Sequence, residues 1–198
     1  MNRDTTMTKA LWPSQTLARD GVLIVGASIL VAIAAQVSIG QPVPISLQTL
    51  AILIVGFSLG ANRGAAALML YLGYGAAGLP VFANGMNGVA FVGPTAGFLV
   101  GFVGMAWAAG WAAERGIARG FFGTAIAALI ISALLYVPGV AWPMGVAGAM
   151  GIEAGWVGLS ADRIWAGFVA PFLLGDAIKA VLAALIVSGG WSLIRRRG

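Results

Sequence analysis

The chain alternates long apolar runs with short segments that are polar or rich in glycine and proline. Residues 21–62 and residues 64–113 contain no charged side chain. Because a helix that crosses a bilayer needs about 20 apolar residues, each run is long enough for two crossings. Two more apolar segments lie on either side of a Gly- and Trp-rich stretch at 138–170. The pattern predicts an all-α membrane protein, a single domain at 21–194, with six transmembrane helices at about 21–39, 45–59, 64–77, 96–113, 120–137 and 171–194.

Polar segments flank the predicted domain. Residues 1–20 are expected to form a cytoplasmic tail, with a short amphipathic helix near Leu11 and Trp12, and residues 195–198 a basic cytoplasmic C-terminus. A cleaved signal peptide is the alternative for the first apolar run, since residues 32–34 (Ala-Ile-Ala) resemble a cleavage site. The long polar lead and the apolar runs that follow favour a retained helix.

Composition excludes a soluble domain, because 60% of the residues are hydrophobic and only 9% are charged, against about 25% charged in soluble proteins. All basic residues except Arg163 and Lys179 fall before the first helix, after the last, or in the turns at 60–64 and 114–120. In a six-helix arrangement these positions share one side, which the positive-inside rule assigns to the cytoplasm. The basic residues form no stripe with interleaved aromatics, so nucleic acid is not expected as a partner.

The segment at 78–95 is uncharged, but its two prolines and four glycines disfavour a regular helix. Non-helical backbone at membrane depth is tolerated only where protein buries it or where it lines a cavity. We therefore expect this segment to border a cavity on the outer side. The stretch at 138–170 is expected to be a second outer loop, folded back over the bundle, so that the last helix begins at Pro171.

Glycine supplies 30 of the 198 residues, about twice the usual share. Two pairs recur at four-residue spacing, Gly56 with Gly60 and Gly97 with Gly101. Small residues at this spacing let helix backbones approach closely in a membrane. We expect both pairs at helix–helix contacts.

The chain has no cysteine and no histidine. These absences exclude disulfides, zinc–thiolate sites and the commonest general base. No Gly-Lys-Ser or Gly-Lys-Thr phosphate-binding loop occurs, so the chain is not expected to hydrolyse ATP. We expect no enzyme activity, no cofactor and no metal.

Asp176 and Lys179 are charged residues inside an apolar segment. A charge at the bilayer centre costs about 2.5–3.5 kcal/mol on insertion scales, and residues three apart share a helical face. One interpretation is an ion pair that only fixes helix packing. The interpretation we favour is a binding pocket near the outer end of the helix, in which the aspartate accepts hydrogen bonds and the lysine holds an anionic group.

Other candidate binding residues lie in or near the 78–95 segment. The amide of Asn84 supplies both donors and an acceptor, which suits a cyclic urea or amide, and Tyr74 and Phe91 would wall an apolar part of the ligand. Gln48 and Thr49 are further candidates for the pocket. Asn87 is expected to form a turn and Gln36 to bond neighbouring backbone, and we expect solvated or paired side chains at Glu153, Asp162 and Arg163.

Several motifs, in this order, resemble the BioY family, the biotin-specific substrate-binding (S) components of energy-coupling factor (ECF) transporters. The motifs are QPVPISLQTL at 41–50, LGANRG at 59–64, YLGYGAAGLPVFANG at 71–85, GPTAGF at 93–98 and GDAIK at 175–179. The resemblance covers about 20–195. It implies a six-helix S component that captures biotin from outside and works with a coupling transmembrane protein and a pair of ABC-type ATPases.

By motif match, the resemblance also implies a ligand-contacting asparagine at Asn84 and a functional pair at Asp176 and Lys179. With biotin as ligand, Lys179 would pair the carboxylate or a polar ring atom, and Asp176 and Asn84 would meet the ureido edge. Family members often have proline where this chain has Leu174, which affects where the last helix begins.

Three other functions stay open on the sequence. The chain could be an S component for another vitamin, such as thiamin or riboflavin. It could be an integral membrane enzyme that uses Asp176 and Asp162 as acids or metal ligands, or a scaffold subunit without a ligand. Without the resemblance, the residues indicate only a six-helix membrane protein with an outward polar pocket.

Overall fold

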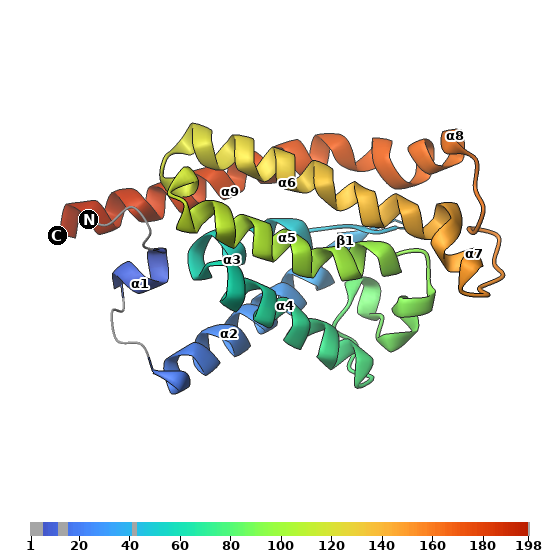
Figure 1. Ribbon diagram of the computed structural model, residues 1–198, viewed down its shortest axis with the longest axis horizontal. Helices are drawn as coiled ribbons and strands as arrows, with labels where there is room; N and C mark the ends of the chain where they lie inside the picture. The colour runs from blue at the N-terminus through green and yellow to red at the C-terminus, as the bar shows by residue number, and fades with distance from the viewer. Residues whose placement is uncertain (1–5, 12–15, 41–42, 198) are drawn as a thin grey trace.

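The computed structural model describes residues 6–11, 16–40 and 43–197, and helices make up most of this part of the chain (Figure 1). Trp12 of the predicted amphipathic helix and Gln41 and Pro42 of the QPVPISLQTL motif lie outside the described residues. The helices and strands are α1 Met7–Leu11, α2 Leu17–Gln36, β1 Ser38–Ile39, β2 Ile45–Ser46, α3 Gln48–Leu59, α4 Ala61–Ala76, α5 Ala96–Glu114, α6 Phe121–Ala141, α7 Ala147–Ala149, α8 Ala161–Ile164 and α9 Ala170–Arg197.

The first long helix begins and ends earlier than expected. Thr16 caps α2, because its hydroxyl accepts a hydrogen bond from the backbone N–H of Arg19 at 3.2 Å. After Gln36 the chain is extended, and β1 pairs antiparallel with β2. The first predicted helix, 21–39, therefore extends too far at its C-terminal end, and the second, 45–59, begins too early. Prolines between the two segments disfavour helix, and the extended residues satisfy their backbone groups by pairing with each other.

A single residue, Gly60, separates α3 from α4, so the predicted turn at 60–64 is too long. Gly60 has a φ of +91°, which glycine adopts without strain. The first N–H of α4, on Ala61, donates to Glu114 Oε1 at 3.0 Å. The Glu114 carboxylate thus satisfies a helix-terminal donor that has no partner within α4.

Replacing Glu114 by alanine should lower the free energy of unfolding by about 1–2 kcal/mol, the usual cost of losing a helix cap. The measurement is thermal unfolding of the purified protein in detergent. Glu153→Ala is the matched control, because Glu153 is exposed in the loop after α7. Equal midpoints for the two variants would contradict the capping role.

The predicted loop at 138–170 is mostly helical. The structure continues α6 through Pro138 to Ala141 and, by a π-helical turn at Trp142–Val146, to Ala149. Helix resumes at Ala161 and reaches α9 through a second π-helical turn at Trp165–Val169. Proline is tolerated inside membrane helices because neighbouring elements satisfy the freed backbone groups, so Pro138 and Pro171 did not mark helix ends here.

Because helical structure runs through Pro171, the charged pair lies further from the start of the helix than the sequence predicts. The sequence predicts a last helix that begins at Pro171, with Asp176 and Lys179 in its first turns. Helical structure instead begins at Ala161, so both residues lie near the middle of the helical stretch 161–197.

Both glycine pairs lie at helix–helix contacts, as predicted. A Cβ on Gly56 would meet Ala106 O and Ala109 Cβ of α5 at 2.6 Å. On α5 itself, a Cβ on Gly97 would meet Pro138 O of α6 at 2.2 Å. These contacts place α5 between the α3–α4 pair and α6.

Four helical stretches of the described chain are long and apolar enough to cross a membrane: Leu17–Gln36, Ala96–Glu114, Phe121–Ala149 and Ala161–Ile194. The remaining bundle helices are shorter, with 12 residues in α3 and 16 in α4. At 1.5 Å per residue, α3 is about 18 Å long, against about 30 Å of hydrocarbon.

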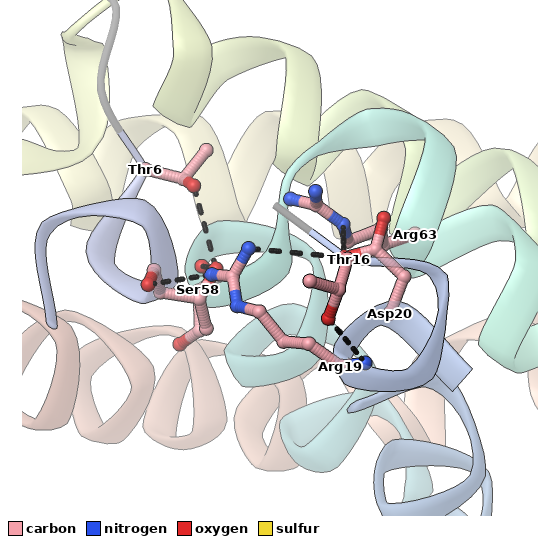
Figure 2. Close-up of polar contacts among 7 residues, drawn as sticks. Thr6, Thr16, Arg19, Asp20, Ser58 and Arg63 are labelled. Carbon is pink, nitrogen blue, oxygen red and sulfur yellow. Dashed lines mark hydrogen bonds and ion pairs between the residues drawn. The ribbon is translucent and has the colours of Figure 1, made fainter. Parts of the chain in front are cut away.

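A polar cluster ties α1 to the bundle at the end where α9 terminates (Figures 1 and 2). The buried Arg19 guanidinium donates from Nη2 to the carbonyl of Thr8 at 2.8 Å, and the Thr8 hydroxyl donates to the carbonyl of Ser58 at 3.1 Å. Arg63 Nε lies 2.9 Å from Asp20 Oδ1. Residues 7–11 therefore pack against the bundle instead of forming a free tail.

Candidate binding cavity

A cavity of about 210 Å³ lies between the start of α3, the 82–95 segment, α5, α6 and α9. Four of the predicted site residues line it: Gln48, Asn84, Asp176 and Lys179. Among the described residues that line the cavity, Asp176 and Lys179 are the only charged ones. Most of the remaining wall is apolar, and its aromatic members are Phe82, Phe98, Phe102 and Phe172.

The charged pair is held by hydroxyl groups from two other helices. Lys179 Nζ lies 3.3 Å from Asp176 Oδ1 and donates to Thr49 Oγ1 of α3 at 3.0 Å. Tyr136 of α6 donates to Asp176 Oδ2 at 2.5 Å. An ammonium group has three N–H donors, so the two described partners of Lys179 leave one donor for a ligand. The side chains are 9% and 13% exposed for Lys179 and Asp176, which fits charges reachable only through the cavity.

Gln48 begins α3 and connects the cavity wall to the 78–95 segment. Its Oε1 accepts from the Ser46 hydroxyl at 3.0 Å, and its Nε2 donates to the Tyr71 hydroxyl at 2.6 Å. Tyr71 in turn donates to the carbonyl of Val81 at 3.2 Å and lies edge-on to Phe82, with 5.2 Å between ring centroids. This chain of contacts fixes the amide and still leaves it one N–H.

Asn84 adopts a left-handed backbone conformation, with a φ of +58°. Asparagine is among the residues that tolerate this region. The Ser38 hydroxyl accepts from the Asn84 backbone N–H at 3.0 Å and donates to Asn84 Oδ1 at 2.9 Å. The carbonyl side of the amide is thereby occupied, and the Nδ2 donors have no partner among the described residues.

Tyr74 and Phe91, which the sequence predicts as apolar walls for the ligand, do not line this cavity. Tyr74 follows the buried Tyr71 by three residues, which turns it about 60° around α4. It borders a separate shallow hollow beside Ile33 of α2. Phe91 lies one layer behind the wall, edge-on to Phe82 with 5.5 Å between ring centroids.

Other polar residues lie as the sequence predicts. Gln36 Nε2 donates to the carbonyls of Val81 and Phe82, each at 3.3 Å. Asn87 Oδ1 accepts from the backbone N–H of Val89, a turn-forming contact. Three charged residues are exposed, Glu153 in the loop after α7 and Asp162 and Arg163 in α8.

Sequence reasoning missed two residues that shape the site, Tyr136 and Phe98. Phe98 ends the GPTAGF motif, which could have identified it. Tyr136 lies in a largely apolar helix, and no local pattern distinguishes it from a lipid-facing or core residue.

The arrangement suits binding of a small polar ligand. A lysine donor, a carboxylate and two amides surround a space with aromatic walls, so donors and acceptors are both available inside an apolar enclosure.

The fold matches a solved structure described as the "S-component for biotin from an ECF-type ABC transporter", with a TM-score of 0.70 over 93% of this chain and 96% of that one, at 23% sequence identity. The fold is therefore that of an ECF S component.

Sequence comparisons identify the family within this class of S components. The BioY family model matches residues 4–196. The "Biotin transporter BioY" of Rhizobium etli is 38% identical over 160 residues, covering 79% of this chain and 83% of that protein. That of Rhodobacter capsulatus is 35% identical over 163 residues, covering 76% and 80%. The chain belongs to the BioY family, and it is a multi-pass membrane protein.

Proposed function

We propose that the chain captures biotin at the outer face of the cell membrane and serves its uptake as the substrate-specific component of an ECF-type transporter. The observation that carries the proposal is the Asp176–Lys179 pair, buried against a cavity with aromatic walls in a chain of this family. An ion pair that served packing alone would not need a cavity or an unused lysine donor.

The chemistry of biotin fits the cavity. Biotin has a carboxylate tail, a ureido ring with two N–H donors and a carbonyl, and an apolar thiophane ring. The Asp176 carboxylate retains acceptor capacity for ureido N–H groups, and the Nδ2 donors of Asn84 suit the ureido carbonyl. Lys179 can donate to a further polar atom, and Phe98 and Phe172 offer apolar contact to the ring.

We further propose six crossings with both termini in the cytoplasm. The four long helical stretches supply four crossings, and α3 and α4 would supply two shorter ones in a locally thinned bilayer. The distribution of charge supports the orientation. Lys9, Arg19, Arg63, Arg115 and Arg119 belong to α1 or to helix ends and turns at one end of the bundle, which the positive-inside rule places in the cytoplasm.

A coupling transmembrane protein and a pair of ABC-type ATPases complete the proposed transporter. The chain has no phosphate-binding loop of its own, so energy from ATP would have to come from other subunits. The function requires no catalytic group in this chain, and we propose that it is not an enzyme.

Equilibrium binding of radiolabelled biotin to the purified chain tests the function. We expect saturable binding of one biotin per chain, displaced by unlabelled biotin and not by thiamin or riboflavin. Displacement by either of these vitamins at similar concentrations would support the alternative S component instead. Absence of saturable biotin binding would refute the proposal.

Replacing Asn84 by alanine should weaken biotin binding by about tenfold, because a ligand hydrogen bond is worth about 0.5–1.5 kcal/mol and the Ser38 contact that orders the segment is also lost. Asn87→Ala is the matched control in the same segment, since Asn87 does not line the cavity. The same binding assay measures both, and an equal effect of the two substitutions would contradict direct contact by Asn84.

A further inference from the structure

Tyr136 lies behind the charged pair and does not itself line the cavity. Its hydroxyl donates to Asp176 Oδ2 at 2.5 Å, while Lys179 Nζ lies 3.3 Å from Oδ1. Each carboxylate oxygen therefore has one donor from the protein. A hydrogen bond to an ionised acceptor is stronger than one between neutral groups, so Tyr136 both orients the carboxylate and offsets part of its charge.

Packing fixes the position of the Tyr136 ring. It lies edge-on to Phe98, with ring centroids 6.2 Å apart and an interplanar angle of 87°. Phe98 also contacts Phe172, at 6.5 Å between centroids, and it fits over Gly139, where a Cβ would meet Phe98 Cε1 at 2.4 Å. The phenol is thus held by the same aromatic side chains that form the cavity wall.

We propose that Tyr136 is a positioning residue that makes Asp176 select neutral hydrogen-bond donors over cationic ones. This proposal rests on the proposed function, because it concerns how the biotin cavity discriminates among ligands. With Oδ1 beside Lys179 and Oδ2 bonded to Tyr136, the carboxylate has enough acceptor capacity for ureido N–H groups but little uncompensated charge. Removal of the phenol hydroxyl exposes that charge to the cavity, which favours a cation.

The test compares biotin with 2-iminobiotin, in which a guanidinium-type cation replaces the neutral ureido group. Dissociation constants are measured for the wild-type chain and for Tyr136→Phe. We expect biotin binding to weaken about tenfold on loss of a hydrogen bond to a charged group, and 2-iminobiotin binding to weaken much less, so that the preference for biotin falls several-fold. Tyr74→Phe is the matched control, because Tyr74 borders a different hollow.

A merely structural role for Tyr136 would weaken both ligands by the same factor, and an unchanged ratio of the two constants would overturn the proposal. The hydrogen bond is tested separately, without any ligand, by NMR of ¹³Cζ-labelled tyrosine in the wild-type and Asp176→Asn chains. The chain has three tyrosines, so assignment is simple. The Tyr136 signal should move on Asp176→Asn and the Tyr74 signal should not.

Failure of the proposed function can be distinguished from failure of the positioning role of Tyr136. A wild-type chain that binds no biotin refutes the proposed function, and the NMR comparison still decides whether Tyr136 holds Asp176. A Tyr136 signal that Asp176→Asn leaves in place overturns the positioning role, even where biotin binds tightly. If Tyr136→Phe does not fold, the NMR comparison of the other two chains still tests the hydrogen bond on which the proposal depends, and an unmoved Tyr136 signal overturns it.

Discussion

Replacing Lys179 by methionine should weaken biotin binding by a hundredfold or more. Truncating one partner of a buried, hydrogen-bonded charge pair costs about 2–5 kcal/mol, and each 1.4 kcal/mol is about a factor of ten in affinity. The substitution removes the ligand's ammonium partner, and among the described residues it leaves Asp176 with only Tyr136 as donor. Methionine is similar in length to lysine and suits an apolar interior. The loss of affinity would therefore come from the missing charge and not from a void left by a shorter side chain.

Two further variants separate binding from folding. Arg163→Met is the matched control, since it also exchanges a cation for methionine but at an exposed position in α8. The single variant buries an unpaired carboxylate, which itself destabilises a fold. Adding Asp176→Asn to Lys179→Met should therefore restore the melting temperature without restoring biotin binding. Affinity of the Lys179→Met chain within threefold of the wild type would contradict the assigned role.

Replacing Gly110 by valine should prevent the chain from folding stably. A Cβ on Gly110 would meet Ala61 N and Gly60 C at 2.2 Å, and these are backbone atoms that cannot rotate away. Overpacking of a core typically costs about 1–3 kcal/mol, and more where backbone must move. The contact lies where α5 packs against the junction of α3 and α4, so separation of the helices there would also displace Gln48 and Thr49 from the cavity.

Gly104→Val provides the comparison, because a Cβ on Gly104 of the same helix meets nothing within 4 Å. The yield of monodisperse protein in detergent and its melting temperature measure the effect. We expect the Gly104 variant to resemble the wild type and the Gly110 variant to aggregate or to melt far below it. Similar melting temperatures for the two variants would show that the close approach of α5 is not essential.

The sequence located the charged pair for a physical reason. Charges in an apolar segment are costly, so Asp176 and Lys179 stand out against their neighbours without knowledge of the fold. The non-helical segment at 78–95 stands out in the same way, because its prolines and glycines lie in an uncharged run. Both predictions rest on local composition, and the structure brings both features to one cavity.

Other features depend on tertiary contacts that no local pattern records. Proline is common at helix ends in soluble proteins. Here the helices pass through both Pro138 and Pro171. Tyr71 and Tyr74 are indistinguishable by type and differ by one turn of α4, yet only Tyr71 bonds to the cavity residue Gln48. Tyr136 acquires its role only when α6 packs against α9.

Native mass spectrometry of the chain, purified from cells grown with biotin, tests the central claim most directly. We predict that the wild-type chain carries a mass increment equal to one biotin and that the Lys179→Met chain, prepared identically, carries none. A wild-type chain without this increment, or an equal increment on both chains, would contradict the binding of biotin by the buried pair.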